Sequence, residues 1–359
     1  MIEPLVGQII HPTILLILTD FAIFLVVTLS LNFEVGIAGI SQFGRVLAVQ
    51  VGAYIAGGLT GRILASMIGL PSGAEYANHL INFKLVDQIN RALLKPNPAL
   101  SLGILVLTLI LAAIIGGIVG WLTSYPAIRL KEAYLGITLL AFGDVLMIIA
   151  WNYDPLVGAT QGVNVPDPFR WAGPYRFEVA TGIALILAVF TFIFFELIVR
   201  SPFGRALKAM RDDEVAAKVY GKDIVKLRTY ALIIGSAFAA MAGAYYTLYM
   251  GSCKAITYTR LTWTFWPWAF MMLGGTGNNL GIAVGVLLFS IVRTLIIMYK
   301  GNLAPYVPFD PVWLEYIFVG AVIILLSMFR PQGILPEKPE LPLSRKKIES
   351  IRASLAKGD

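Results

Sequence analysis

Long apolar stretches constrain this chain more than any other feature of its sequence. Runs of roughly 20 apolar residues recur along it, and each suffices to cross a bilayer as an α-helix. We therefore predict an all-α fold, a polytopic helical membrane protein of about nine transmembrane helices within a range of about eight to ten. The predicted spans are residues 12–32, 36–60, 100–126, 134–152, 179–199, 229–252, 262–277, 279–299 and 314–330.

The composition excludes several other classes of protein. Charged residues make up 14% of the 359 residues, whereas about 25% of an average soluble protein is charged. The two histidines, His11 and His79, and the single Cys253 cannot form a Cys-rich zinc site or an internal disulfide, so we predict no metal site. A nucleic-acid domain would need a solvated basic face. The expected surroundings are the lipid bilayer, with no nucleic-acid partner.

The positive charge is confined to two polar stretches. Residues 200–228 contribute +4 and residues 330–359 contribute +3, which equals the net +7 of the chain. The positive-inside rule places both stretches in the cytoplasm, and nine spans then place the N-terminus outside. We predict a transmembrane domain over residues 1–336 and a basic cytoplasmic tail over 337–359 in a multi-pass protein of the cell membrane. The other segments expected on the inner side are 33–35, 127–133 and 277–279.

Two apolar segments are rich in glycine and do not read as ordinary spans. Gly36 and Gly39 interrupt the early segment, and Gly274, Gly275 and Gly277 interrupt the late one. We predict broken or re-entrant segments near 36–54 and 262–281. Interrupted helices early and late in a chain are typical of a transport path. Close packing of helices on small residues explains the glycines equally well.

Charged residues also fall at membrane depth. Asp20, Asp144 and Arg293 lie near the middle of predicted spans, and Arg45 lies within the broken second span. Each would cost about 2.5–3.5 kcal/mol or more if it faced lipid, so each should face protein or water. One interpretation is a polar lining or gate, with Arg45 or Arg293 paired to Asp144. The other is a set of structural ion pairs or snorkelling side chains.

Two features are expected near the outer surface. The aromatic cluster at 263–270 follows the predicted outer loop at 253–261, and we interpret it as a belt at the headgroup level. Residues 79–94 carry spaced apolar residues that predict a short amphipathic helix on that surface.

The cytoplasmic loop at 200–228 has the pattern of two short helices. Ser201-Pro202 is typical of a helix start, and Asp213 can cap a second helix that ends at Gly221. Such a helix pair could dock in a groove of a soluble partner. Its charge would equally suit an amphipathic loop on anionic lipid.

This loop carries a family resemblance. Glu214-Val215-Ala216-Ala217 followed by Gly221 resembles the EAA loop of ABC importer permeases, and residues 201–246 are similar to the LivM-type permease of branched-chain amino-acid importers. Other blocks with the same resemblance follow in family order, and as a set they are highly specific. They are residues 31–54, 126–144, 158–163, 273–286 and 329–335.

The chain departs from the family pattern in two motifs and in a long external insertion around residues 70–98. Gln42-Phe43-Gly44-Arg45 stands where the family usually has Ser-Leu-Gly-His, and Ala159-Thr160-Gln161 stands where Gly-Ser/Thr-Asn is usual. Both motifs fall where a substrate could pass. The identity of the substrate therefore stays open.

The resemblance implies a transport subunit that is not an enzyme. It would form half of the translocation path for branched-chain or related amino acids, beside a second related permease. Two cytosolic ABC ATPases and an external substrate-binding protein would be its other partners. The chain lacks a G-x-x-x-x-G-K-[ST] loop, so ATP and Mg would be bound by the ATPases, and no cofactor is expected on this chain.

The resemblance also assigns candidate site residues. Those expected to couple to the ATPases are Phe203, Arg205, Ala206, Arg211, Glu214, Ala216, Ala217 and Gly221. Those expected to line or frame the path are Asn32, Gly36, Gly39, Ser41, Gln42, Arg45, Asp144, Thr160, Gln161, Gly274, Gly275, Thr276 and Gly277.

Two other functions stay open at this stage. One is a permease for urea or short-chain amides with the same loop chemistry. The other is an ion-coupled secondary carrier, in which Asp20 and Asp144 would bind a proton or sodium.

Overall fold

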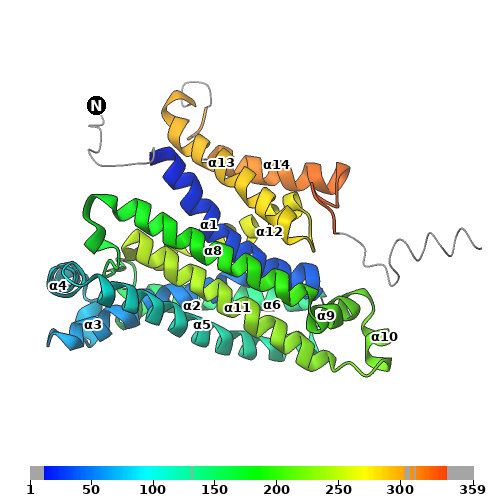
Figure 1. The fold of residues 1–359 in the computed structure, drawn as a ribbon, viewed down its shortest axis with the longest axis horizontal. Helices are drawn as coiled ribbons and strands as arrows, with labels where there is room; N and C mark the ends of the chain where they lie inside the picture. The colour runs from blue at the N-terminus through cyan, green and yellow to red at the C-terminus, as the bar shows by residue number, and fades with distance from the viewer. Residues whose placement is uncertain (1–11, 131, 304–307, 311–312, 338–359) are drawn as a thin grey trace, which may run out of the picture.

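The computed structural model describes residues 12–130, 132–303, 308–310 and 313–337, which are mostly helical (Figure 1). The predicted all-α class is confirmed. The predicted tail, beyond Glu337, lies outside the described residues. The described α-helices are α1 Pro12–Asn32, α2 Arg45–Tyr54, α3 Gly61–Met67, α4 His79–Ile89, α5 Pro98–Arg129, α6 Glu132–Asn152, α7 Asp154–Val157, α8 Arg176–Arg200, α9 Pro202–Asp212, α10 Glu214–Val219, α11 Ile224–Met250, α12 Trp266–Gly274, α13 Asn279–Leu303 and α14 Trp313–Phe329.

Seven helical runs among the described residues are long and apolar enough to cross a membrane. They are Pro12–Ile37, Arg45–Met67, Pro98–Arg129, Ala133–Asn152, Arg170–Arg200, Ile224–Met250 and Asn279–Asn302. The predicted spans at 262–277 and 314–330 correspond to the shorter helices α12 and α14, so the count of about nine full spans is not confirmed. The predicted outer helix at 79–94 is present as α4 and the π-helix Asn90–Leu94 that continues it.

Both predicted interruptions are present. The π-helix Phe33–Ile37 extends α1, and the chain is then non-helical until α2 begins at Arg45. Late in the chain, α12 ends at Gly274, and Gly275 and Gly277 have positive φ angles of 117° and 83°. The π-helix Leu261–Phe265 and α12 together span roughly 21 Å at 1.5 Å per residue. That length falls short of the roughly 30 Å hydrocarbon core, so this segment turns inside the protein.

Helix α11 is the centre of the bundle. It packs against α5, α2 and α1, while α1 also packs against α8 and α13, and α12 against α13 and α14. Within their apolar windows 72% of α11 is buried, against 28% of α8 and of α6. The surfaces of α8 and α6, and of α5 at 33%, are therefore available to face lipid or another subunit. In Figure 1 the long helices run side by side, with α9 and α10 at one end and α3 and α4 at the other.

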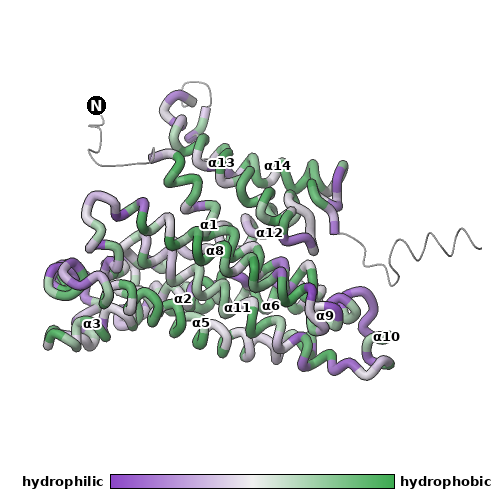
Figure 2. The backbone as a smooth tube through the Cα atoms, in the orientation of Figure 1, coloured by the Kyte–Doolittle hydropathy of each residue, from purple (hydrophilic) through white to green (hydrophobic). Residues whose placement is uncertain are grey.

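The segments predicted to be cytoplasmic meet at one end of the bundle. Arg211 in α9 contacts Gly36 and Glu337, and Arg228 donates to the Ala127 carbonyl at 3.4 Å. The opposite end holds the antiparallel pair of β1 Val163–Asn164 and β2 Ser252–Cys253. Hydrophilic residues gather at both ends, and the helices between them are hydrophobic (Figure 2).

Several glycines allow helices to touch backbone to backbone. A Cβ at Gly52 in α2 would lie 1.8 Å from the Ala240 carbonyl oxygen of α11, and one at Gly243 in α11 would lie 2.0 Å from the Val49 oxygen. No side chain fits at such a distance, so these glycines serve the close packing of helices.

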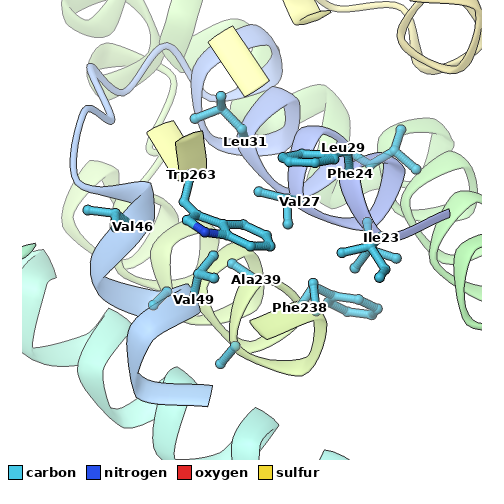
Figure 3. Packing of buried hydrophobic residues seen from close by; sticks show 14 of the residues in the cluster. Ile23, Phe24, Val27, Leu29, Leu31, Val46, Val49, Phe238, Ala239 and Trp263 are labelled. Atoms are coloured by element: carbon cyan, nitrogen blue, oxygen red, sulfur yellow. The ribbon is translucent and has the colours of Figure 1, made fainter. Parts of the chain in front are cut away.

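The aromatic cluster at 263–270 lies mainly in the core, so its interpretation as a headgroup belt was wrong. Trp263, Trp266 and Phe270 are all buried. Trp263 stacks on Phe24 with ring centroids 5.2 Å apart, and Figure 3 shows it among residues of α1, α2 and α11. The cluster belongs to the short segment that turns inside the protein, which puts these rings against other helices.

The Gly52 contact gives a prediction about stability. Gly52→Ala should lower the midpoint of thermal unfolding in detergent, because overpacking a filled interface costs about 1–3 kcal/mol. The matched control is Gly182→Ala in α8, where nothing lies within 4 Å of an added Cβ. That control should be neutral or slightly stabilising, as alanine favours helix over glycine. Equal midpoints for the two variants would contradict the packing role of Gly52.

Candidate functional site

The predicted pair of short helices forms as α9 and α10. Ser201 Oγ accepts from the Gly204 N–H at 3.3 Å and caps α9. Asp213 Oδ1 accepts from the Val215 and Ala216 N–H groups, both at 2.9 Å, and caps α10. Such side-chain acceptors satisfy N–H groups that have no partner within the helix.

Helix α10 ends just before α11 begins. Gly221 follows α10 with a φ of 74°, which a non-glycine residue adopts only with strain. Asp223 then caps α11, and the Lys226 N–H that its carboxylate accepts holds the pKa of Asp223 below its usual value. An ion pair of 2.8 Å between Glu214 and Arg228 ties α10 to the first turns of α11.

The predicted coupling residues divide into an inner and an outer set. Phe203, Ala206 and Arg211 are half-buried, and Ala217 is buried, so these side chains hold the two helices against the bundle. Arg205, Glu214, Ala216 and Gly221 are exposed. They lie beside apolar side chains of the α10 region that are more than 70% exposed, namely Val215, Val219 and Tyr220.

The two glycine interruptions touch each other. Asn32, at the end of α1, accepts from the Gly277 N–H through Oδ1 at 2.8 Å and donates to Asn279 Oδ1 through Nδ2 at 3.1 Å. A Cβ at Gly36 would lie 2.7 Å from the Gly277 nitrogen. One buried amide side chain therefore joins the early break to the late one.

Arg211 connects helix α9 to both breaks. Its Nη1 donates to the Gly36 carbonyl at 2.5 Å and to Glu337 Oε2 at 2.8 Å. Gly39 has a φ of 70°, and a Cβ there would lie 2.9 Å from Arg211 Cγ. Lys208 forms a second ion pair with Glu337 at 3.2 Å. We call this set of contacts the α9 junction.

The segment after α14, residues 330–337, contacts both the late break and α9, and we call it the strap. Ile334 and Leu335 N–H groups donate to the Leu273 and Gly274 carbonyls at 2.9 and 3.0 Å. Gly275 lies so close that a Cβ there would be 2.2 Å from the Leu335 oxygen. Glu337 then extends to Lys208 and Arg211 of α9. A cavity of about 630 Å³ adjoins this strap, lined by Phe192, Glu196, Val199, Arg200, Lys208, Gly277, Asn278, Asn279, Leu280, Leu335 and Glu337.

Of the remaining predicted path residues, two lie at the other end of the bundle and three lie within the breaks. Thr160 and Gln161 are exposed at the opposite end, beside a cavity of about 670 Å³ that His79 and Asp154 also line. Gln42 is buried and accepts from the Gly44 N–H at 2.9 Å, while Ser41 is half-buried and Thr276 exposed.

The intramembrane charges form pairs that differ from the predicted ones. Arg45 pairs with Glu34, both with no exposed side chain, and Asp144 pairs with Arg260 at 2.8 Å. The expected pairing of Arg45 or Arg293 with Asp144 was therefore wrong. Arg45 begins α2 just after the turn that follows Glu34. The turn brings these two residues close together, so Glu34 is the acid that pairs with Arg45. Arg293 contacts Asp20 and, at 2.5 Å, Glu315.

Sequence reasoning missed several residues of these networks. Glu34, Asn279 and Glu337 were not singled out, and Glu196 and Glu315 were given no role. Glu34 could have been found from the sequence, because it is an acid within an apolar run and lies eleven residues before Arg45. Glu196 Oε2 accepts from Asn279 Nδ2 at 3.0 Å, a contact between helices distant in sequence. Among the described residues, no group of three or more His, Cys, Asp or Glu could hold a metal ion.

The Glu34–Arg45 pair gives a prediction about folding. Glu34→Ala should leave a buried guanidinium without its counter-charge, which costs about 3–5 kcal/mol. We expect less monodisperse protein and a lower unfolding midpoint in detergent. Replacing both members, as Glu34→Leu with Arg45→Met, should recover most of the loss, because an apolar pair removes the buried charge altogether. A double variant as unstable as the single one would refute this account.

Comparison of the sequence with known proteins identifies a family. A family model described as "Branched-chain amino acid transport system / permease component" matches residues 13–327. The chain is 42% identical over 345 residues to a "Probable branched-chain amino acid transport permease protein LivM" of Methanocaldococcus jannaschii, a match that covers 94% of this chain and 97% of the relative.

More distant relatives include two permeases of one bacterium. The chain is 25% identical to the "High-affinity branched-chain amino acid transport system permease protein LivM" of Escherichia coli, over 65% of this chain and 58% of that protein. It is also 25% identical to LivH of Escherichia coli, over 65% of this chain and 76% of that protein. No solved structure matches the chain. Because the family match covers most of its length, the chain belongs to the family of permease components of branched-chain amino-acid transport systems.

Proposed function

We propose that this chain is a permease subunit of an ATP-binding-cassette importer for branched-chain or related amino acids, and that the α9 junction couples it to cytosolic ATPases. The contact of Arg211 with Gly36 and Glu337 carries the coupling proposal. The names of the relatives support the substrate class.

The orientation follows from the charge distribution and the arrangement of the ends. The end that holds α9 and α10 also holds Asn32, Gly277 and Glu337. With the +4 loop in the cytoplasm under the positive-inside rule, α1 starts on the outer side and the chain leaves α14 on the inner side. This supports an external N-terminus and a cytoplasmic C-terminus.

The exposed face of α10 is the proposed ATPase contact. Val215, Val219 and Tyr220 are 73%, 80% and 83% exposed, and apolar side chains grouped on a protruding helix are typical of a protein interface. If α10 only lay on the lipid surface, it would anchor the loop to the membrane and would have no part in coupling. The second permease would pack on the sparsely buried helices, and an external binding protein would deliver substrate to the end that carries Thr160 and Gln161.

The junction would convert closure of the ATPases into movement of the two breaks. A displacement of α10 carries α9, because the two helices share the Asp213 cap. Arg211 then pulls on the Gly36 carbonyl and, through Glu337, on the strap that holds Gly274 and Gly275. The left-handed backbone at Gly39 and Gly277 lets the chain bend there without side-chain strain.

An ion-coupled carrier is less consistent with this structure. Asp20 and Asp144, its expected ion ligands, already pair with Arg293 and Arg260. A guanidinium at such a carboxylate would compete with a bound sodium ion.

Docking through α10 can be tested by co-purification. Tyr220→Glu should reduce the amount of ATPase that co-purifies with the tagged chain at least tenfold, because the substitution puts charge into an apolar contact. Phe83→Glu is the matched control, since Phe83 is 67% exposed in α4 at the opposite end. Retention of the ATPases by Tyr220→Glu would contradict the docking role, and purification of the wild-type chain with no ATPase would contradict the proposed function itself.

Coupling through Arg211 can be tested by transport stoichiometry. Arg211→Ala should leave the complex assembled but lower the substrate transported per ATP hydrolysed at least tenfold in proteoliposomes, because α9 loses its bond to the Gly36 carbonyl and one of its two ion pairs with Glu337. Lys226→Ala is the control, an exposed cation in the same region whose partner among the described residues is Asp223. The measurement uses leucine, urea and acetamide as substrates. An unchanged ratio in Arg211→Ala would contradict the coupling role, and transport of urea or acetamide instead of leucine would contradict the substrate class.

A further inference from the structure

The ion pair of Asp144 and Arg260 lies on the surface of the bundle rather than inside it. Asp144 Oδ2 and Arg260 Nη1 are 2.8 Å apart, and the two side chains are 32% and 52% exposed. Other intramembrane pairs of the described residues are covered more, with 19% and 22% exposure in Asp20–Arg293 and none in Glu34–Arg45. Lipid cannot solvate an exposed charged pair, so water or another protein must cover this one.

Two segments place this pair near the middle of the membrane. Helix α6 extends roughly 18 Å from its cytoplasmic end at Glu132 to Asp144, and roughly 12 Å further to Asn152. The helical segment from Leu261 to the late break at Gly274, which follows Arg260, covers roughly 21 Å. The pair therefore lies roughly 20 Å from the cytoplasmic ends of both segments, inside a hydrocarbon core of about 30 Å.

Helix α6 and this segment run side by side in matching register. Phe43 stacks on Trp268 with ring centroids 4.6 Å apart, and a Cβ at Gly136 would lie 2.7 Å from the Phe43 ring. Asp144 lies eight residues after Gly136, and Arg260 lies eight residues before Trp268. The two contacts are therefore separated by roughly 12 Å along both elements, which confirms the depth of the ion pair.

The chain that leads to Arg260 continues the polar surface toward the outer end. It leaves β2 at Cys253 and contacts α6 through the 3₁₀-helix Ala255–Thr257. Ala255 and Tyr258 are buried on one side of it. The exposed side chains on the other side are Lys254, Ile256, Thr257 and Arg260. Such irregular backbone at membrane depth is tolerated only where protein or water satisfies it, because lipid offers no hydrogen bonds.

The other sparsely buried helices have apolar surfaces. Helix α8 has no charged residue between Glu178 and Glu196, and α5 has none from Pro98 to Ile128. In α8, Ile186 and Val189 are 69% and 56% exposed. Exposed apolar side chains of this kind suit the hydrocarbon of the bilayer. The charged pair therefore distinguishes α6 from α5 and α8.

Toward the cytoplasm the same side of α6 is apolar. Ile137 and Ala141 precede Asp144 by seven and three residues, so all three lie on one face of the helix. Ile137 is 67% exposed, and Ala141 is exposed as well. We call this surface the α6 face, and its residues are Ile137, Ala141, Asp144, Lys254, Thr257 and Arg260.

We propose that the α6 face meets the second permease and that α5 and α8 face lipid. From Lys254 inward to Ala141 the two subunits enclose water, which solvates the Asp144–Arg260 pair and lines the outer part of the path. At Ile137 the two subunits touch and close that water off from the cytoplasm. A related chain is the fitting occupant, because it presents an equivalent polar face across a pseudo-twofold axis. This inference rests on the proposed function, since it assigns one face to the second permease of that importer.

The water is tested with a membrane-impermeant, cationic methanethiosulfonate reagent on the full complex in nanodiscs, in a Cys253→Ser background. Ala141→Cys should react at least about tenfold faster than Val189→Cys, because a thiol reacts as the thiolate, which forms in water and not in lipid. The two positions are matched in depth, roughly 14 Å and 17 Å from the cytoplasmic ends of α6 and α8. Mass spectrometry of this chain gives the rates. Equal rates, or a faster reaction at Val189→Cys, would overturn the proposal.

The subunit contact is tested by photocrosslinking from p-benzoylphenylalanine. In place of Ile137 it should crosslink this chain to the second permease. In place of Ile186, whose exposure of 69% matches the 67% of Ile137, it should crosslink to lipid. A crosslink to the second permease from position 186 and none from position 137 would place the partner on α8 and contradict the proposal. A crosslink from position 137 to another copy of this chain would contradict it too.

The failure of this inference is distinguishable from that of the proposed function. If the wild-type complex imports leucine with ATP, but neither the thiol rates nor the crosslinks favour the α6 face, that face is refuted and the importer stands. If the wild-type chain assembles with no second permease and imports no amino acid, the proposed function fails and this inference fails with it.

Discussion

The polar contacts that satisfy two interrupted helices are the constraint on which the rest of this structure depends. A helix that stops inside a membrane protein frees backbone groups that lipid cannot satisfy. Asn32 bonds to the Gly277 N–H, and Arg211 donates to the Gly36 carbonyl. The first side chain joins the two breaks to each other, and the second joins them to α9. The requirement to satisfy backbone groups thereby creates a mechanical connection between a surface loop and the interior of the bundle.

The buried charges follow the same rule and divide into two kinds. Glu34–Arg45 is a one-to-one ion pair with no exposed side chain, and its role is to hold the early turn against the start of α2. Asp20, Arg293 and Glu315 form a cluster in which two carboxylates share one guanidinium. Helices α1 and α13 meet both at the Asp20–Arg293 ion pair and at the Asn32–Asn279 hydrogen bond, so a movement at one contact affects the other.

The sequence was most informative where local chemistry decides the structure. Ser201, Asp213 and Gly221 predicted the boundaries of α9 and α10, because caps and left-handed glycines act within a few residues. Glycine density predicted both interruptions, although it could not separate Gly52, which serves packing, from Gly36, which lies at the junction. The partner of Arg45 and the burial of Trp263 depend on how distant segments meet, and apolar periodicity carries no such information. Arg211 was named from the family resemblance, but its contacts with Gly36 and Glu337 required the fold.

The central claim is that Arg211 transmits the movement of α9 to the interrupted helices. The most direct measurement is the distance between spin labels at Thr276, exposed in the late break, and Tyr134, exposed in α6. It would be made by pulsed electron paramagnetic resonance on the assembled complex in a Cys253→Ser background, before and after trapping the ATP-bound state. The account predicts a shift in this distance that is present with Arg211 and absent in Arg211→Ala. The same shift in both proteins would contradict it.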